Sequence, residues 1–328
     1  MVNLIGERRS AKRMNDYISS RQSQNIVGRV KKYKHSTYAD MLLQDLTASY
    51  SIYLSPKAHD AGFYFVEPPK DNLEKLLSFR SYRWLENDLE DMLTKISYYL
   101  ILNGRAYVEI ATWKKPAKET DQNGEMNQDK AKSEEIVGIS LEPIPVERGV
   151  LVQGRYRFYG QDYKGNSVSF RVEKKNIICF DLKDMRIRRG YFLRLFKRLG
   201  NIDVLKATSY AFDSKLKEKH SFNDHIKKND YLLLKYTKRL HWYGRNPQNQ
   251  QLSESYLSFR AAHFMLWRKS FLDYLIMKLN DGIKRFSEEL HFKGRIKVKD
   301  MEYDYQKKIE DYNAGKINAE ELAKDVFC

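Results

Sequence analysis

The sequence predicts an α+β protein in which antiparallel strands precede long helices. Asn103-Gly104 marks the end of an apolar helix, because glycine reaches positive φ without strain. The next residues, Arg105–Ile110, alternate apolar and polar side chains with the period of a half-buried strand. Tyr163–Asn166 separates two further strand-like runs and has the composition of a hairpin turn. Ser253–Ile283 is apolar on nearly all sides, which predicts a long and largely buried helix.

The overall composition is that of a folded protein. The chain has 328 residues, of which 42% are hydrophobic and 13% aromatic, so it can bury a sizeable core and has room for two domains. Its two cysteines, Cys179 and Cys328, predict neither a disulfide framework nor a zinc site, which fits a reducing compartment. Residues 1–34 lack an apolar signal segment, and charged residues interrupt the apolar run 264–279. We therefore expect no secretion signal and no membrane span.

The N-terminal part predicts a basic arm followed by helices and one strand. We assign residues 1–35 to the arm and expect it to be flexible. Helical spacing from Tyr38 to Leu46 predicts a helix over Ser36–Leu54. A short strand, Phe63–Val66, stops at the following prolines. Two helices follow, at Asn72–Arg80 and Trp84–Leu102, and the second has an apolar stripe.

Several strands complete the predicted α+β domain, which we bound at residues 36–185. After Ile139–Pro145, strands are expected at Tyr156–Tyr159, Ser167–Val172 and Asn176–Asp181. The segment Trp113–Glu135 is rich in Lys, Glu, Gln and Asn and has no apolar pattern. We interpret it as a mobile surface loop.

Beyond Asp184 the chain is predicted to be helical. Tyr191–Leu199 is expected to form a short helix that ends at Gly200-Asn201, and a longer helix then runs until Asn229-Asp230 breaks it. We group residues 186–251 as basic helices with a terminal loop, and residues 252–328 as the long helix with a C-terminal helical region. In that region, Gly315 should stop one helix and Asn318 should cap the next, with Glu321 at the capping-box position.

Positive charge is concentrated in two segments. The net charge is +16, and residues 186–248 contain 16 Lys/Arg against 5 Asp/Glu. Residues 1–34 contain 9 against 2, whereas residues 35–185 contain 20 against 23. A localised surplus indicates one basic face, and phosphate is its commonest partner. The alternative to a phosphate-binding face is a solvent-exposed surface that binds no partner.

The order of these elements resembles the wing region of tailed-phage portal proteins. In that family a helix ends in a Leu-x-Asn-Gly-x-Ala-Tyr turn into a strand, and here an apolar helix end leads into Asn103-Gly104-Arg105-Ala106-Tyr107. A Leu-x-Pro-x-x-Val strand follows, and then a strand ending in Ile-Ile-x-Phe, which Ile177–Phe180 matches. The polar loop Asn246–Gln251 before the long helix resembles the portal tunnel loop, and Gly315–Glu321 resembles the Gly-x-Ile-Thr-x-Asn-Glu ending near portal C-termini.

This resemblance implies a portal-like fold, with a wing followed by stem and channel helices. It implies a homo-oligomeric ring, usually a dodecamer, through which double-stranded DNA is packaged and ejected. The implied partners are the major capsid protein, terminase and a head-completion or tail adaptor protein, and the implied location is the virion, after assembly in the host cytoplasm. Neighbouring subunits would then cover the second apolar face of the long helix. Residues 202–243 leave little room for a clip domain, so we expect the clip to be reduced or absent.

Two sets of residues are candidates for contact with DNA. The predicted channel residues flank or lie in the tunnel-like loop and are Lys238, Arg239, Arg245, Asn246, Gln248 and Asn249. The predicted basic surface comprises Arg186, Arg188, Arg189, Arg194, Lys197 and Arg198. Cations would guide the duplex, and amide side chains would exchange weak hydrogen bonds with phosphates.

Catalytic functions have no positive support in the sequence. It contains no phosphate-binding loop of the Gly-x-x-x-x-Gly-Lys-Ser/Thr type, no His-Glu-x-x-His, no Gly-x-Ser-x-Gly and no Cys-x-x-Cys. We therefore predict no enzyme activity, no catalytic residues, no metal site and no cofactor. The alternative function is a monomeric or dimeric basic nucleic-acid-binding protein, such as a replication initiator, because that class also combines winged α+β domains with basic helices.

Overall fold

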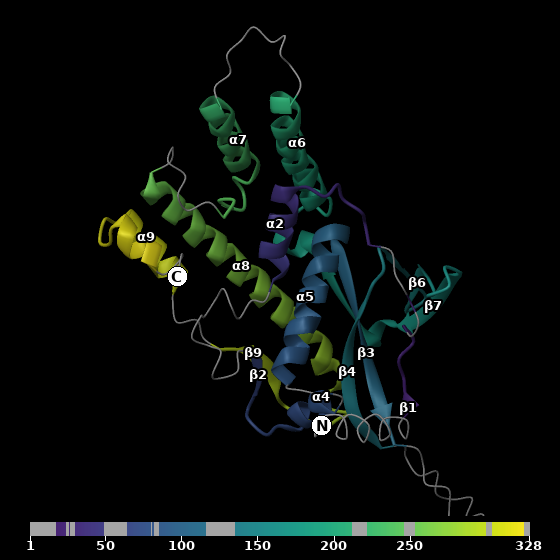
Figure 1. The fold of residues 1–328 in the computed structure, drawn as a ribbon. Coiled ribbons are helices and arrows are strands. Elements are labelled where there is room, and N and C mark those ends of the chain that lie inside the picture. The colour runs from purple at the N-terminus through teal and green to yellow at the C-terminus, as the bar shows by residue number, and fades with distance from the viewer. Residues whose placement is uncertain are drawn as a thin grey trace, which may run out of the picture.

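Helices and strands are both extensive in the computed structural model, so the α+β class is confirmed (Figure 1). The structure describes residues 18–23, 26, 30–48, 64–79, 81, 85–115, 135–211, 222–245, 253–299 and 304–324. Two antiparallel sheets and a two-stranded ribbon form the β part, and the helices pack around them.

The main sheet is built on β3 (Arg105–Lys114), which pairs with β4 (Ile136–Ile144) along one edge. On its other edge β3 pairs with β8 (Ile177–Asp181) and with the short β1 (Ile18–Ser19). The predicted turn into β3 is confirmed, since Gly104 has φ of 77°. A Cβ there would lie 2.5 Å from the Arg189 Cβ, so both the backbone angle and the close approach require glycine.

A second sheet contains β5 (Gly149–Val152), β6 (Arg155–Gln161) and β7 (Ser167–Glu173). The predicted hairpin between β6 and β7 is confirmed: the Asp162 carboxylate accepts hydrogen bonds from the backbone N–H groups of Lys164 and Asn166, at 2.9 and 2.8 Å. One face of this sheet packs on β3 through Tyr107 and Phe158, whose ring centroids are 5.2 Å apart.

The predicted helices before β3 are confirmed; the first two end earlier than expected, and the third ends one residue later, at Asn103. Helix α2 (Thr37–Thr47) begins at the N-cap Ser36, and α4 (Asn72–Ser78) begins at the N-cap Asp71. Helix α5 (Leu85–Asn103) covers the main sheet. The strand β2 (Tyr64–Glu67) pairs antiparallel with β9 (Arg295–Val298) from the far end of the chain. Of the predicted loop at 113–135, residues 116–134 lie outside the described residues. Trp113 and Lys114 instead belong to β3.

Part of the predicted flexible arm lies on the main sheet. The backbone N–H groups of Gln22 and Ser23 donate to the buried carboxylate of Glu109, at 2.7 and 2.9 Å. Further along, the Lys31 N–H donates to Asn103 Oδ1 at 2.9 Å. The expectation of a free arm is therefore wrong for these residues, because Glu109 and Asn103 fix their backbone. Residues 1–17 lie outside the described part.

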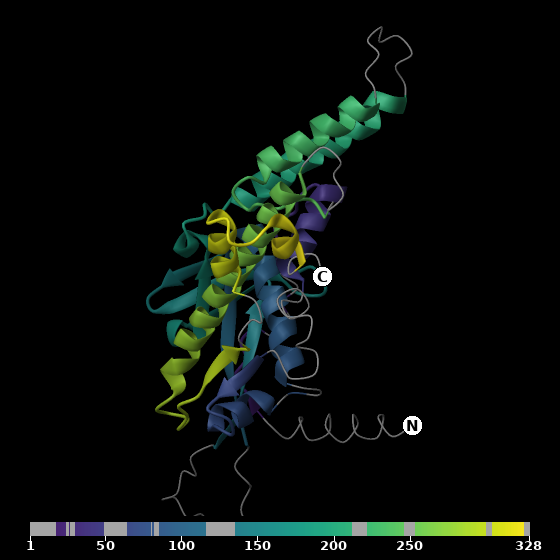
Figure 2. The same cartoon turned by 90° about the vertical axis from the view of Figure 1, so that its left-hand side faces the viewer.

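Helices α6 (Tyr191–Ala211) and α7 (Phe222–Tyr236) lie side by side and extend beyond the rest of the described chain (Figure 2). The predicted ends at Gly200-Asn201 and Asn229-Asp230 are wrong, because both pairs lie inside helices. Gly200 is buried where α6 meets α2, with Ser36 Oγ 3.6 Å from the position of a Cβ. Glycine inside a helix costs about 1 kcal/mol relative to alanine, which the apolar burial of α6 outweighs.

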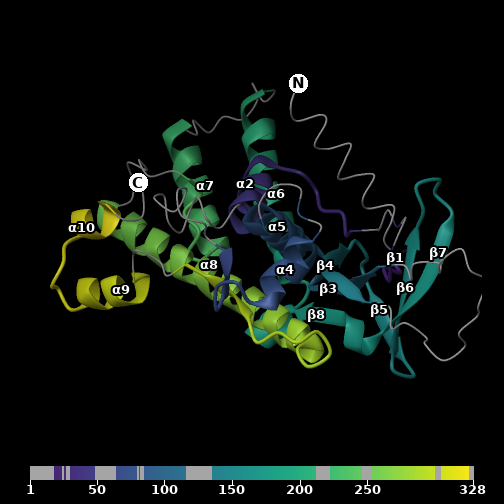
Figure 3. The same ribbon diagram turned by 90° about the horizontal axis from the view of Figure 1, so that it is seen from below.

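The long helix is confirmed as α8 (Glu254–Ile283), with Ser253 as its N-cap. Two short helices, α9 (Tyr305–Asn313) and α10 (Ala319–Lys324), pack against it (Figure 3). Between them, Asn318 Oδ1 accepts from the Glu321 N–H at 2.8 Å, and the Glu321 carboxylate accepts from the Asn318 N–H at 2.9 Å. The predicted capping box is thus confirmed.

The cover over α8 comes from its own chain. Ala262 contacts Ile309 of α9 and Leu322 of α10 in one buried cluster, while β8 and β9 pack along the second half of the helix. Leu257, Phe271 and Leu279 are each no more than 2% exposed. Neighbouring subunits are therefore not needed to cover a second apolar face of this helix, because α9 and α10 already do so.

One apolar core crosses the predicted domain boundaries at residues 185 and 251. It extends from Leu42 of α2, through Phe180 of β8 and Phe196 of α6, to Leu279 of α8. The α+β part and the helices that follow it thus share a core. Within the described ranges, no helix combines the length and the apolar character needed to cross a membrane.

Candidate nucleic-acid interface

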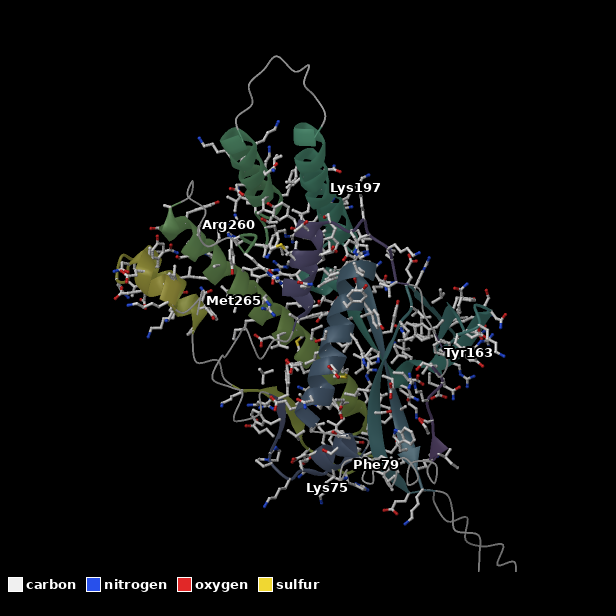
Figure 4. The ribbon with its side chains drawn as sticks, viewed as in Figure 1. Lys75, Phe79, Tyr163, Lys197, Arg260 and Met265 are labelled. Atoms are coloured by element: carbon white, nitrogen blue, oxygen red, sulfur yellow. The ribbon has the colours of Figure 1, made fainter. Side chains whose placement is uncertain are left out.

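The start of α6 separates apolar and basic side chains. The chain leaves β8 through a 3-10 turn, Leu182–Met185, which Arg186 ends in the left-handed conformation with φ of 58°. On α6, the inward positions Phe192 and Phe196 are fully buried. The outward positions are cationic, and residues 186–202 contain no Asp or Glu. The exposed cations of this segment are Arg186, Arg188, Arg194, Lys197 and Arg198, and Figure 4 shows Lys197 on the outer side of α6.

Arg189, the remaining member of the predicted basic surface, is neutralised. Its Nε donates to Asp181 at 2.9 and 3.0 Å, its Nη2 also contacts that carboxylate, and Arg105 Nε donates to it at 3.0 Å. Burial opposes ionisation of Asp181, but hydrogen bonds from Arg189, the Lys183 N–H and Arg105 lower its pKa to about 2. Arg189 therefore holds the linker to β8 through an ion pair with Asp181, a carboxylate that it shares with Arg105.

The end of α7 brings a second basic segment to the same place. Arg239 Nη2 donates to the Arg186 carbonyl at 2.8 Å, and its guanidinium lies 5.5 Å from the centroid of the Tyr191 ring. Arg198 in turn lies 5.7 Å from the centroid of the Tyr236 ring. Cation–π contacts of this kind hold a guanidinium in position without removing its charge.

Members of the two predicted sets thus lie near one another, and we call them the α6–α7 basic surface. They are exposed cations of α6, of the linker before it and of the turn after α7, namely Arg186, Arg188, Arg194, Lys197, Arg198, Lys238 and Arg239. A set of neighbouring cations can contact several phosphates of one nucleic-acid backbone.

The turn that follows α7 is fixed by a buried carboxylate. Asp45 of α2 is 5% exposed, and its Oδ2 accepts a hydrogen bond from Trp242 Nε1 at 2.7 Å. Its Oδ1 accepts from Arg245 Nε and Nη2, at 2.8 and 2.6 Å. From α8, Arg260 Nη2 donates to the Trp242 carbonyl at 2.8 Å and to Thr237 Oγ1 at 3.0 Å (Figure 4).

Arg245 therefore differs from the other channel candidates. Two of its donors are committed to Asp45, so its role in this structure is to anchor the turn, and its charge is matched. Asn246, Gln248 and Asn249 lie outside the described residues. The structure places the two flanks of that loop, Arg245 and the N-cap Ser253, next to the α7–α8 junction.

Two histidines pack together beside this turn. The rings of His241 and His263 are stacked with centroids 4.6 Å apart, and Phe259 lies against His263. Burial, together with the neighbouring His263, Arg260 and Lys238, lowers the pKa of His241 to about 4. His241 is thus neutral at pH 7 and adds nothing to the α6–α7 basic surface.

The sequence contained a weak signal for this arrangement. Asp45 occupies an apolar position of a predicted amphipathic helix, where a carboxylate needs a buried partner, but the sequence does not show that the partners lie at Trp242 and Arg245. Nothing in the sequence pattern indicated that Tyr191 and Tyr236 would contact the guanidinium groups of Arg239 and Arg198. Among the described residues, no group of three or more His, Cys, Asp and Glu side chains could hold a metal ion.

Comparison with known proteins gives no relative that could assign this surface. No protein-family model matches the chain, and no curated protein matches it either. The function must therefore be inferred from the residues and their geometry.

Proposed function

We propose that this chain is a portal-like subunit that assembles into a ring at a capsid vertex and passes double-stranded DNA. The observation that carries the proposal is the helical pair α6–α7, which extends from an α+β body and bears a basic surface without matching carboxylates between residues 186 and 202. The major capsid protein, terminase and an adaptor protein would be its partners in the virion, after assembly in the host cytoplasm.

Further support comes from the order of elements around α8. A helix leads through an Asn-Gly turn into β3, antiparallel strands follow, and a helical pair then leads through a turn into the long α8. This is the order that the portal resemblance implies. Only residues 212–221 separate α6 from α7, which is too short for a clip domain, so terminase would have to dock on another surface.

The α6–α7 basic surface is suited to weak, sequence-independent contact. Its members are exposed arginines and lysines, which reach phosphate oxygens without reading base edges. Two of them, Arg198 and Arg239, are held by tyrosine rings, so they lose less side-chain freedom when they meet a phosphate. Exposed charge pairs are screened by salt, which lets DNA slide past without being trapped.

A monomeric or dimeric nucleic-acid-binding protein, such as a replication initiator, is the second candidate. One observation favours it: α9 and α10 cover α8 within the same chain, so no neighbouring subunit is needed to bury that helix. The α6–α7 basic surface would serve such a protein equally well.

Sedimentation and electron microscopy separate the two proposals. A portal-like subunit should sediment as a closed oligomer of several hundred kilodaltons and show rings in negative stain. A concentration-independent 39 kDa monomer would overturn the portal proposal. Nanomolar, sequence-specific DNA binding at physiological salt by such a monomer would support the initiator instead.

A further inference from the structure

The outer face of the β5–β7 sheet is apolar and basic. Cross-strand pairing places Val150, Arg157 and Arg171 in one row on the face opposite the core residue Phe158. Tyr159 lies on the same face and is 55% exposed, and Val152 at the sheet edge is 51% exposed. We call Val150, Val152, Arg157, Tyr159 and Arg171 the outer sheet face. An exposed apolar strand edge tends to pair with another protein unless it is covered.

The two arginines of this face oppose each other without a paired carboxylate, and the Arg157 guanidinium lies 5.1 Å from the centroid of the Tyr159 ring. Arg157 and Arg171 are direct cross-strand partners, and like charges in that position destabilise a sheet. Nearby, Glu173 is taken by Arg155 and Lys175, and no carboxylate of the described chain forms an ion pair with Arg157 or Arg171. The buried Arg157 Nε also lacks a hydrogen-bond partner there. A carboxylate that approaches this face would relieve the opposition of the two positive charges.

A groove elsewhere on the chain has the complementary character. It has a volume of about 310 Å³ and lies between α4, α5 and β4. Its apolar floor includes Leu77, Leu89 and Leu141, and on its rim stand the exposed carboxylates of Asp88 and Asp91. Among the described residues, the other charged groups that line it are Lys95, whose positive charge offsets part of this negative charge, and Glu142, which is paired with Arg21 at 3.2 Å. We call this the acidic groove.

The two surfaces lie on different parts of the molecule. The β6–β7 hairpin extends from one side, away from α4 and α5 (Figure 3). In Figure 4, Tyr163 at the hairpin tip lies at the right-hand edge of the molecule, and Phe79 at the end of α4 lies near its bottom. The outer sheet face and the acidic groove can therefore be engaged at the same time by two different copies.

We propose that the outer sheet face of one subunit docks into the acidic groove of the next, which rests on the proposed ring. Arg157 and Arg171 would meet Asp88 and Asp91, while Val150, Val152 and Tyr159 would cover the apolar floor. Because each copy carries both surfaces, the contact is heterologous and repeats around a closed ring. Complementary charge would set the register between neighbours, and burial of the apolar residues would supply the affinity.

Charge reversal on each surface tests this interface. The sheet variant is Arg157→Glu with Arg171→Glu, and the groove variant is Asp88→Lys with Asp91→Lys. Each alone replaces attraction by repulsion, so we expect the concentration needed for assembly to rise about tenfold or more. Mixing the two variants should restore assembly, because each then meets an opposite charge on its neighbour. A chain carrying all four changes should assemble by itself.

The controls distinguish a disrupted interface from an unfolded subunit. Lys227→Glu with Lys307→Glu introduces a charge change of the same size at exposed lysines on α7 and α9 and should assemble like the parent. Arg171→Glu alone, at an exposed position, serves as a milder sheet variant if the double change unfolds the hairpin, and cooperative thermal unfolding checks each variant.

The outcomes distinguish this interface from the ring itself. If the parent forms a ring and both reversals assemble as the parent does, the proposed interface is wrong while the portal proposal stands. If both variants fail and the mixture also fails, the failure has another cause and the interface is again wrong. A parent that remains a monomer would overturn both the interface and the ring.

Discussion

Trp242 and Asp45, nearly two hundred positions apart in the chain, share a buried hydrogen bond of 2.7 Å between the indole Nε1 and the carboxylate Oδ2. The same carboxylate holds Arg245 through its other oxygen. A single side chain of α2 thus fixes the turn between α7 and α8, and with it one flank of the loop that the sequence assigns to the DNA channel.

Replacing Asp45 with Ala should destabilise the protein by about 2 kcal/mol, because it leaves the buried indole N–H of Trp242 without its acceptor and removes the ion pair with Arg245. Urea unfolding at pH 7 measures this. Asp273→Ala is the matched control, since Asp273 is 58% exposed and pairs only with Lys269 on the surface. We expect that control to stay within about 0.5 kcal/mol. Equal destabilisation of both variants would contradict the anchoring role of Asp45.

Replacing Glu109 with Ala should loosen the attachment of residues 18–23 to the main sheet. The Glu109 carboxylate is 1% exposed and accepts the backbone N–H groups of Gln22 and Ser23, whose hydrogen bonds would then be removed. Hydrogen exchange at these two amides should become at least about tenfold faster, while amides in β8 remain protected. Unchanged exchange at Gln22 and Ser23 would show that the β1–β3 pairing alone holds the segment.

Acidification should destabilise the protein between about pH 6.5 and 4 through His241. Its folded pKa is lowered from 6.5 to about 4, so the unfolded chain binds more protons in that window. The stability it contributes is present above pH 6.5 and is lost as pH falls through the folded pKa. Urea midpoints across this range should fall less steeply for His241→Asn, which tolerates the positive φ of 56°. An unchanged pH profile in that variant would assign the destabilisation to other groups.

Neutralising the α6–α7 basic surface should weaken DNA binding uniformly across sequences. Arg194→Ala with Lys197→Ala removes two exposed cations that have no structural partner in the described chain. The slope of log affinity against log salt should become shallower by about 0.9 for each phosphate that the variant no longer neutralises. Fluorescence anisotropy with duplexes of unrelated sequence measures both effects. Lys307→Ala on α9 should leave the affinity and the slope unchanged, and an equal effect there would show that only net charge matters.

Local sequence patterns predicted most of the helices, strands and turns, because the residues that determine a cap or a turn lie within a few positions of one another. Asn318 and Glu321 form the expected capping box, and Gly104 makes the expected turn. The failures arose where tertiary packing overrides a local signal. Gly200 has the composition of a helix end, but it lies inside α6, where that helix packs beside Ser36 and neighbouring apolar residues are buried.

The functional surface was predictable only in part. Arg194, Lys197 and Arg198 follow helical spacing within one segment, so their common exposed face could be inferred from the sequence. The ion-pair partners of the other arginines could not be inferred: Asp181 lies eight residues before Arg189 with no helical spacing to link them, and Asp45 lies 200 residues before Arg245. The exposed and compensated arginines look alike in the sequence, and only the fold distinguishes them.

The antiparallel pairing of Tyr64 with Val298 limits how much of the protein can fold while it is being synthesised. During synthesis β2 emerges early, yet its partner β9 leaves the ribosome only after α8 has been made. The apolar residues of α8 that pack against Ile309 and Leu322 remain uncovered even longer, until α9 and α10 have been synthesised. A nascent chain therefore carries an unfinished apolar surface for most of its translation, and we expect it to depend on chaperones and to aggregate when truncated before β9.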